Sequence, residues 1–506
     1  MSKHPGATNA VDRCPSGIGG LDTILEGGFP RSCVYLIQGD PGSGKTTLAL
    51  QFLLEGVRRG ESTFYVTLSE TREELLRVAN SHGWSLEAIP LLELSAIEDL
   101  LRPERQTTVF HPSEMELNQV SQLLIDEAAK TKPARVVFDS LSEFRLLAET
   151  PLRYRRQLLN LKQHFAAHGS TVLLLDDKMN LSAIATDPHV LSLSHGVIEM
   201  EQLSPDYGAA RRRLRVVKLR GVKFREGYHD YTIETGGLRV FPRLVAAEHH
   251  REFKRELVGS GVAELDALLG GGLDRGTTAL ILGTAGTGKS SLALQYAANM
   301  AKQGDHGIIF AFDETREIML ARAEGLGLDL PRHVASGMVT VQQVDPAEVS
   351  PGEFANRIRQ HVDHGCRLVV IDSINGYLNS MPGERYLNNQ LHELTSYLNQ
   401  KGALTILIVA QHGLVGPAES PVDLSYLSDA VIYLRYFEAA GAVRQSVSVM
   451  KKRTGRHEKT IREFRLESGR GIRVGEPLID FQGVLSGVPV FHGGAAEMMR
   501  ADDGSN

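Results

Sequence analysis

The sequence predicts an α/β protein made of two tandem copies of one P-loop NTPase domain, each a mostly parallel sheet flanked by helices. Three observations lead to this fold class. Two long segments repeat each other, starting at Ser16 and Ser260. Short apolar runs alternate with helical patterns in both copies, and a glycine-rich loop follows an early run in each. Runs that are apolar throughout indicate strands buried on both faces, which is typical of parallel sheets covered by helices.

The repeat extends along almost the whole chain and sets the domain boundaries. The P-loop lysines and the acids of SETREE and DETREI are separated by one interval, whereas RVVFDS and RLVVIDS, and KLRG and KKRT, share a second, shorter one. Landmarks that keep their order over such a distance indicate a domain duplication rather than a solenoid. We predict a first domain over 12–248, a charged linker over 249–258, a second domain over 259–492 and a polar, disordered tail over 493–506.

Composition excludes several classes of protein. The chain has 506 residues, a formal net charge of −6, 42% hydrophobic and 23% charged residues, as an ordinary globular protein has. This acidic balance argues against DNA as a partner. The three cysteines, Cys14, Cys33 and Cys366, are well separated and favour a reducing compartment without disulfides or a zinc site. Neither a secretory signal nor about 18 consecutive apolar residues occurs, so we expect a cytoplasmic protein outside the membrane.

Two segments, GDPGSGKTT and GTAGTGKSS, fit the P-loop pattern G-x-x-x-x-G-K-[ST]. Their glycines let backbone N–H groups turn toward phosphate oxygens, and the next helix presents its positive N-terminus to them. The alternative, a glycine turn that binds nothing, is disfavoured by two matches at duplicated positions. The predicted ATP-binding residues are Gly39, Gly42, Ser43, Gly44, Lys45, Thr46 and Thr47, and Gly283, Gly286, Thr287, Gly288, Lys289, Ser290 and Ser291.

An aspartate at the end of a later apolar run completes each predicted magnesium site. Asp139 and Asp372 fit the acid that holds Mg²⁺ through water, beside the P-loop hydroxyls of Thr46 and Ser290. The alternative role for either aspartate is a helix N-cap.

Hydrolysis also requires a carboxylate that orients or deprotonates the attacking water. Glu70, Asp313 and Glu314 follow the strand after each P-loop helix, which places them across the γ-phosphate from the lysine. The alternative is a solvated first turn of helix, where the helix dipole favours acids.

Basic segments come late in both copies, RRRLRVVKLRG and VSVMKKRTGRHEK. They alternate like strands and leave three interpretations open. They form a solvated face, they reach the ATP of a neighbouring subunit, or they contact DNA.

Several of these motifs together resemble one family. The segments SGIGGLD, GDPGSGKT, SHGW, KLRG, GTAGTGKS and HEKTIREF occur in order over about residues 12–490. They are similar to those of the KaiC family, duplicated RecA-like ATPases known from the cyanobacterial clock. The resemblance implies two tandem RecA-like domains that stack as hexameric rings with ATP between subunits. It implies that Ser81 lies near the first nucleotide and that Lys218, Arg220, Lys451 and Arg453 touch ATP across the interface.

The resemblance also implies an activity for each ring. The first would be an ATPase, and the second an ATPase that in clock members phosphorylates and dephosphorylates itself on adjacent Ser and Thr. Members carry two glutamates after the strand that follows the P-loop helix, whereas this chain carries Ser69 before Glu70 and Asp313 before Glu314.

Two further departures concern phosphorylation and regulation. The phosphorylated pair aligns with Ser425 and Tyr426, of which Ser425 is the better candidate. The tail from Gly493 is short and lacks the helical segment that engages the activator KaiA in clock members, so we do not expect a KaiA-type activator.

Three functions follow from the sequence as hypotheses. The first is a KaiC-like homohexameric ATPase that turns over slowly, with Ser/Thr autokinase and autophosphatase activity open at its second domain. The second is a DNA-dependent RecA-type ATPase. The third is a nucleotide-gated hexameric scaffold with little turnover, whose state a KaiB-like or signalling partner would read. ATP and Mg²⁺ are the expected cofactors in all three.

Overall fold

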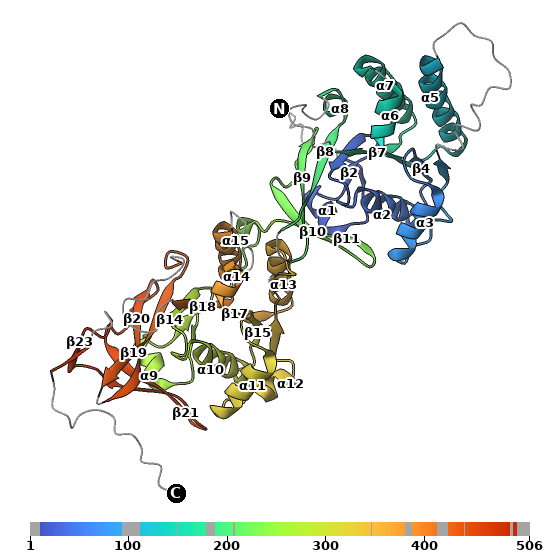
Figure 1. The fold of residues 1–506 in the computed structure, drawn as a ribbon. Coiled ribbons are helices and arrows are strands. Elements are labelled where there is room, and N and C mark those ends of the chain that lie inside the picture. Colours follow the sequence, from blue (N-terminus) through green and yellow to red (C-terminus); the bar gives the residue numbers. More distant parts are fainter. Residues whose placement is uncertain are drawn as a thin grey trace, which may run out of the picture. The chain divides into compact units, whose positions relative to one another are not determined.

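The computed structural model describes residues 11–93, 112–148, 150–178, 188–205, 208–345, 347–379, 387–411, 424–439, 441–485 and 489–492. The chain divides into two compact units, Met1–Arg243 and Leu244–Asn506 (Figure 1). The predicted tail over 493–506 lies outside the described residues.

A nine-stranded sheet forms the centre of the described part of the first unit, in the order β11-β10-β9-β8-β3-β7-β6-β4-β5. The six strands from β8 to β5 run parallel, and β9, β10 and β11 extend the sheet antiparallel. The strands are β3 (Val34–Gly39), β4 (Thr63–Thr67), β5 (Leu91–Glu93), β6 (Arg135–Asp139), β7 (Thr171–Asp177), β8 (Gly196–Leu203), β9 (Arg211–Leu219), β10 (Tyr228–Glu234) and β11 (Gly237–Phe241). A short pair, β1 (Arg13–Cys14) and β2 (Phe29–Pro30), lies apart from it.

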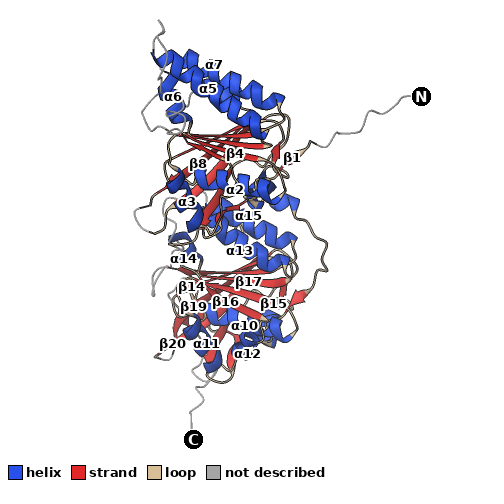
Figure 2. Cartoon of the chain, turned by 90° about the vertical axis from the view of Figure 1, so that its right-hand side faces the viewer, coloured by secondary structure: helices blue, strands red, loops and turns tan. Residues whose placement is uncertain are grey.

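Helices cover both faces of this sheet (Figure 2). One face packs against α1 (Gly19–Ile24), α2 (Lys45–Arg58) and α3 (Arg72–Ser81), and the other against α5 (Pro112–Thr131), α6 (Leu141–Ala148) and α7 (Pro151–Ala167). Alternate residues of β3 enter opposite cores: Tyr35 and Ile37 enter one, and Val34 and Leu36 enter the other. A parallel strand that is buried on both faces therefore reads as a continuous apolar run.

The second unit repeats this arrangement within its described residues, with the sheet order β16-β15-β17-β18-β14-β19-β20-β21-β22. Its strands are β14 (Thr278–Thr284), β15 (His306–Ala311), β16 (Val339–Gln343), β17 (Cys366–Asp372), β18 (Leu404–Gln411), β19 (Ala430–Ala439), β20 (Ala442–Lys452), β21 (Ile461–Glu467) and β22 (Gly471–Pro477). Its helices are α9 (Ala263–Leu268), α10 (Lys289–Lys302), α11 (Arg316–Gly325), α12 (Leu330–Ala335), α13 (Pro351–Asp363), α14 (Ile374–Asn379) and α15 (Leu387–Gln400). The predicted mostly parallel sheets flanked by helices are thus confirmed in both units.

The segment predicted as a linker packs against the second unit. Phe253 lies so close to Gly276 and Gly402 that a Cβ on either glycine would stand 2.3 or 2.5 Å from the ring. Both glycines also have positive φ, +70° and +73°, which a side chain would strain. Just before the predicted linker, Leu244 and Ala246 join a hydrophobic core of this unit. The predicted linker therefore contacts the second unit through Phe253, and its boundaries stay a prediction.

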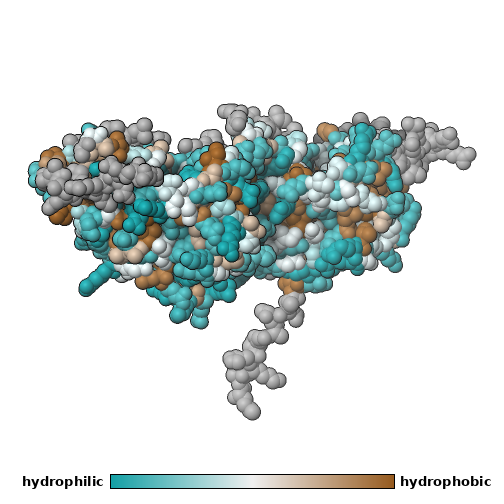
Figure 3. Space-filling model, turned by 90° about the horizontal axis from the view of Figure 1, so that it is seen from below, coloured by the Kyte–Doolittle hydropathy of each residue, from teal (hydrophilic) through white to brown (hydrophobic). Residues whose placement is uncertain are grey.

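On the face drawn in Figure 3, brown residues lie singly or in small groups among hydrophilic ones. Among the helices within the described ranges, none combines the length and the apolar content that a membrane crossing requires.

Candidate functional site

The two glycine loops lie where the fold predicts a phosphate site. Each follows a central strand, β3 or β14, and leads into a helix, α2 or α10. In parallel sheets, ligands bind beyond the carboxyl ends of the strands. The loop glycines adopt the left-handed conformation, with φ of +87° at Gly44 and +94° at Gly288. A Cβ on either would collide with a neighbouring side chain, Ile233 at 2.7 Å or Phe464 at 2.8 Å. Only glycine fits these positions.

The first P-loop lysine, Lys45, is hydrogen-bonded to the backbone of its own loop. The Lys45 Nζ donates hydrogen bonds to the carbonyl oxygens of Gly39 and Asp40, both at 3.0 Å. It also lies 2.8 Å from the Asp177 Oδ1, in an ion pair. The Lys45 side chain is nine-tenths buried, so its charge is only weakly screened by solvent.

A hydroxyl and a carboxylate stand side by side next to that lysine. The Thr46 Oγ1 donates to the Asp139 Oδ2 at 2.9 Å, and the Tyr65 hydroxyl donates to the same oxygen at 2.6 Å. Burial raises the pKa of Asp139, while hydrogen bonds from Tyr65 and Thr46 oppose that rise. Oxygen donors of this kind suit Mg²⁺, which prefers one or two protein ligands beside water and phosphate.

Glu70 lies in the turn between β4 and α3, and its environment favours the neutral form. Burial raises its pKa to about 7, and the charges of Asp139, Glu74 and Asp177 add to the rise. The buried Glu70 Oε2 has no hydrogen-bond partner within the described part of the chain. A carboxyl group with a pKa near neutrality is well matched to accept a proton from water.

The second P-loop differs around its lysine. The Lys289 Nζ donates to the Thr284 carbonyl oxygen at 2.7 Å. Burial lowers the pKa of Lys289 to about 8, with the charge of Asp372 opposing. Burial also raises the pKa of Asp372, which accepts a hydrogen bond from Ser290. The hydroxyl and carboxylate thus meet in both sites.

The two acids of the second site have separate partners. The Ser373 hydroxyl donates to the Asp313 Oδ2 at 2.5 Å. The Glu314 Oε2 forms an ion pair with Arg322 of α11 at 2.7 Å. The structure therefore brings Asp313 and Glu314 to the same strand end as Asp372, with an arginine that the sequence analysis did not identify.

Comparison with known proteins bears on both units. A sequence model of the KaiC ATPase family matches residues 14–245 and 258–479. The chain belongs to the KaiC family. The circadian clock protein KaiC3 of Synechocystis is 26% identical over 491 residues, covering 96% of each chain. The circadian clock oscillator protein KaiC of Synechococcus elongatus is 26% identical over 490 residues, covering 95% of this chain and 92% of its own. That of Parathermosynechococcus lividus is 28% identical over 496 residues, covering 95% and 88%.

Membership of the KaiC family confirms the predicted fold class, two tandem RecA-like domains, and makes this chain a KaiC-like ATP-binding ATPase. The two sites of this KaiC-family chain nevertheless differ beyond their P-loops. Gly39 is in register with Asp177 of β7, and Gly283 with Ala410 of β18. An acid is therefore present at the first site where the second has a methyl group.

The Lys-x-Arg residues lie at the amino-terminal end of the parallel strands in each unit. The P-loop of the same unit lies at the opposite, carboxyl end. Tyr35, the second residue of β3, lies beside Gly196, and Gly196 pairs with Leu219, the residue between Lys218 and Arg220. The P-loop begins four residues after Tyr35, about 13 Å along the strand. In the second unit, Lys451 pairs with Val431 near the start of β19. The structure does not bring these cations to the P-loop of their own chain.

The two candidate phosphosites, Ser425 and Tyr426, lie at the same amino-terminal end of the parallel strands in the second unit. The Lys451 Nζ donates to the Ser425 carbonyl oxygen at 2.7 Å, and the Arg453 guanidinium donates to the Tyr426 carbonyl oxygen at 3.0 Å. Both candidates are exposed, and Tyr426 has 53% of its surface accessible. They therefore lie beside the cations rather than beside their own P-loop.

Ser81 lies at the end of α3, and the predicted arginine run lies on β9. Ser81 ends α3, and its exposed hydroxyl donates to the Val78 carbonyl oxygen at 2.7 Å. On β9, Arg213 pairs with Glu201 at 2.8 Å, and Arg215 pairs with Glu199 at 2.6 Å. This ladder of opposite charges supports the interpretation of the run as a solvated face.

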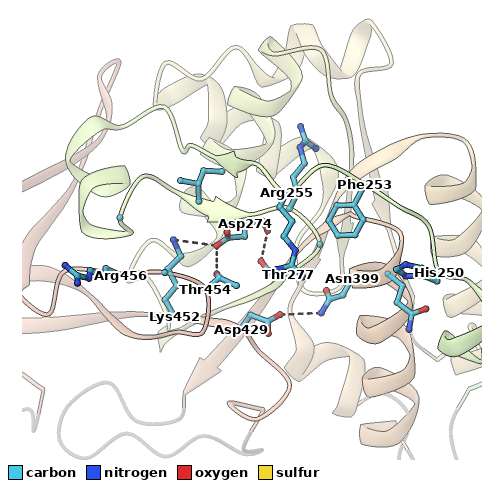
Figure 4. A pocket seen from close by; sticks show the side chains of 16 residues that line it. His250, Phe253, Arg255, Asp274, Thr277, Asn399, Asp429, Lys452, Thr454 and Arg456 are labelled. Carbon is cyan, nitrogen blue, oxygen red and sulfur yellow. Dashed lines mark hydrogen bonds and ion pairs between the residues drawn. The ribbon is translucent and has the colours of Figure 1, made fainter.

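A pocket of about 590 Å³ opens at the amino-terminal edge of the second sheet (Figure 4). The side chain of Lys452 lies 3.6 Å from the Asp274 carboxylate, and the Asn399 amide donates to the Asp429 carboxylate at 3.4 Å. Phe253 of the predicted linker forms part of its wall. The P-loop does not line this pocket, so it is distinct from the predicted nucleotide site.

Proposed function

We propose that this chain is a slow ATPase whose two ATP sites are completed by a second copy of the chain, in a homohexameric ring. The P-loop of one copy would hold the phosphates, and the Lys-x-Arg residues of the next copy would reach the same nucleotide. The observation that carries the proposal is the placement of the P-loop and the Lys-x-Arg residues at opposite ends of the parallel strands in each sheet. Head-to-tail contact between identical copies, which closes into a ring when the rotation between copies permits, would join one end of the strands to the opposite end in the next copy.

Within each site the side chains have separate roles. Lys45 and Lys289 would bind phosphate oxygens. Bound Mg²⁺ neutralises charge on the phosphates, and Thr46 with Asp139, or Ser290 with Asp372, would hold it. Glu70 at the first site would orient the attacking water and accept its proton.

At the second site, Asp313 and Glu314 would share the task of activating water.

The free, separated cysteines agree with a cytoplasmic location. A KaiB-like or signalling protein is a candidate binding partner of the ring, because the surface of the ring would change with the bound nucleotide.

Mixing two inactive variants tests whether the sites form between copies. One variant lacks both P-loop lysines (K45A, K289A), and the other lacks the cations (K218A, R220A, K451A, R453A). Each alone should be inactive. In rings co-assembled from equal amounts, about a quarter of the interfaces join an intact P-loop to intact cations, so about a quarter of wild-type phosphate release should return.

The same mixture separates this proposal from the alternatives. Mixed rings that remain inactive, although sizing shows that both variants are incorporated, would contradict sites shared between copies. ATP-dependent rings in the wild type without phosphate release would favour the scaffold hypothesis. Stimulation of turnover by DNA would favour the recombinase hypothesis.

A second activity, autophosphorylation, is favoured by the location of Ser425. In such a ring the exposed edge that carries Ser425 and Tyr426 would face the P-loop of the neighbouring copy. Lys451 and Arg453, which contact the backbone of the two candidates, would then hold their loop near the γ-phosphate. Transfer would break the bond between the γ-phosphorus and the bridging oxygen and form one to the serine oxygen, releasing ADP and a proton.

Incubation with ATP followed by peptide mass spectrometry tests this activity. We expect phosphate on Ser425 in the wild type, its loss in S425A and in K289A, and its retention in Y426F. The Y426F variant is the matched control because it removes the adjacent hydroxyl and keeps the ring of the side chain. Phosphate release without phosphopeptide, or modification that S425A leaves intact, would contradict the assignment.

A further inference from the structure

We propose that Asp177 is a built-in competitor for the first P-loop lysine and weakens ATP binding at the first site relative to the second. The inference rests on the proposed ATP site at Lys45. Asp177 is the last residue of β7, and its carboxylate forms an ion pair with Lys45 at 2.8 Å. A carboxylate in that position occupies space next to the ammonium that a phosphate oxygen would take.

The fold holds Asp177 at this place. β7 lies beside β3 in parallel, and Asp177 is in register with Gly39, the first residue of the P-loop. Because the carboxyl ends of parallel strands meet at one edge of the sheet, the side chain that ends β7 adjoins the loop that follows β3. The contact is therefore a property of two adjacent central strands.

The surroundings of Lys45 show what a phosphate must displace. Three oxygens lie within 3.0 Å of the Nζ: the carbonyl oxygens of Gly39 and Asp40, and the Asp177 Oδ1. An ammonium group has three N–H donors. The two carbonyl groups belong to the loop backbone, whereas the Asp177 side chain is 42% exposed. The carboxylate is thus the partner that can swing into solvent when a phosphate arrives.

Charge makes the competition stronger than geometry alone. Glu70 and Asp139 already face the same lysine, because their charges appear together with that of Asp177 around the site. A triphosphate that enters beside Asp177 meets the Lys45 ammonium, the carboxylates of Asp177 and Asp139, and Glu70, which is only partly ionised near neutral pH. Anions of like sign that share one ammonium repel each other, and the repulsion falls only when Asp177 moves away.

The second site provides the natural comparison. Ala410 is in register with Gly283 as Asp177 is with Gly39. Lys289 hydrogen bonds to the carbonyl oxygen of Thr284, and no described carboxylate pairs with it. Arg322 supplies a second cation there, whereas the equivalent position of α3 is Val78. The second site therefore lacks this competitor and has one more cation for the same number of acids.

Binding of a fluorescent ATP analogue to the full chain tests the inference. In a K289A background, in which only the first site binds, D177N and D177A should each tighten binding about fivefold, the strength of an ion pair with one partner exposed. Binding of AMP, which does not reach the lysine, should not change. In a K45A background, A410D should weaken binding at the second site by a similar factor.

Glu201 gives a matched control, because it carries the same charge on β8, across β3 from β7, and pairs with Arg213 and Lys178 rather than with Lys45. E201Q in the K289A background should leave the affinity unchanged. Affinity that is unchanged or reduced in both D177N and D177A would overturn the inference, as would a loss of turnover at unchanged affinity. Failure of the K289A chain to bind the analogue at all would instead count against the proposed first site, which separates the two failures.

Discussion

Replacing both P-loop lysines by alanine is expected to lower ATP hydrolysis at least about 100-fold. Each lysine places a nearly buried positive charge where the phosphates would lie, and removing such a charge from a preorganised site costs on this order. Phosphate release by the wild type and by K45A/K289A at equal protein concentration measures the effect. The single variants should each retain the turnover of the other site.

Lys178 provides the control for that experiment. It lies at the same edge of the first sheet but pairs with Glu199 at 2.6 Å, so K178A should stay close to wild-type turnover. Full turnover in the folded double variant, checked by circular dichroism, would rule out hydrolysis at these loops.

Turnover at the first site is expected to rise with pH and to reach half its maximum near pH 7. Glu70 must be ionised to accept a proton, and burial raises its pKa to about 7. Below that pH the carboxyl is protonated and inactive as a base, and above it the carboxylate is present. At pH 6 the rate should be about tenfold below its plateau, and E70Q should lower the plateau about 100-fold or more.

The K289A chain isolates the first site for this measurement. E70Q in the reciprocal K45A chain is the control and should leave the rate unchanged, because only the second site turns over there. A flat profile between pH 6 and 8 in the K289A chain, or full activity of its E70Q variant, would remove Glu70 from the role of base.

The sequence was sufficient for those parts of the site that are local. Each P-loop is one continuous segment between a strand and a helix, so the pattern alone places Lys45 and Lys289. Asp139 and Asp372 could be predicted because a single acid ends a long apolar run. The order of the central strands then confirms that the acids and loops share one edge of each sheet.

Asp177 was missed because its partner, Lys45, is distant in sequence, and Arg322 was missed although Glu314 is only eight residues away. Asp177 follows the run TVLLLD and resembles a polar strand end, and only the pairing of β7 with β3 brings it to Lys45. Its position at the carboxyl end of a buried strand was the available signal. Arg322 lies on α11 within a helical pattern in which a charged residue is ordinary, and its approach to Glu314 depends on the packing of that helix.

The predicted linker over 249–258 stays a prediction, to which the structure adds one contact. The segment is rich in charge, and its Phe253 packs against Gly276 and Gly402. The ring is half-buried there, while its charged neighbours are exposed, a contact that charge composition alone does not predict.

The separation of the P-loop and the Lys-x-Arg residues to opposite ends of the strands also has a consequence for the genetics of defective alleles. Each copy of the proposed ring takes part in two ATP sites per domain, one through its loop and one through its cations. A copy that lacks both functions would silence its neighbour's site as well as its own. Defective alleles should therefore be dominant in cells that also express the intact chain, whereas an allele that cannot assemble should be recessive.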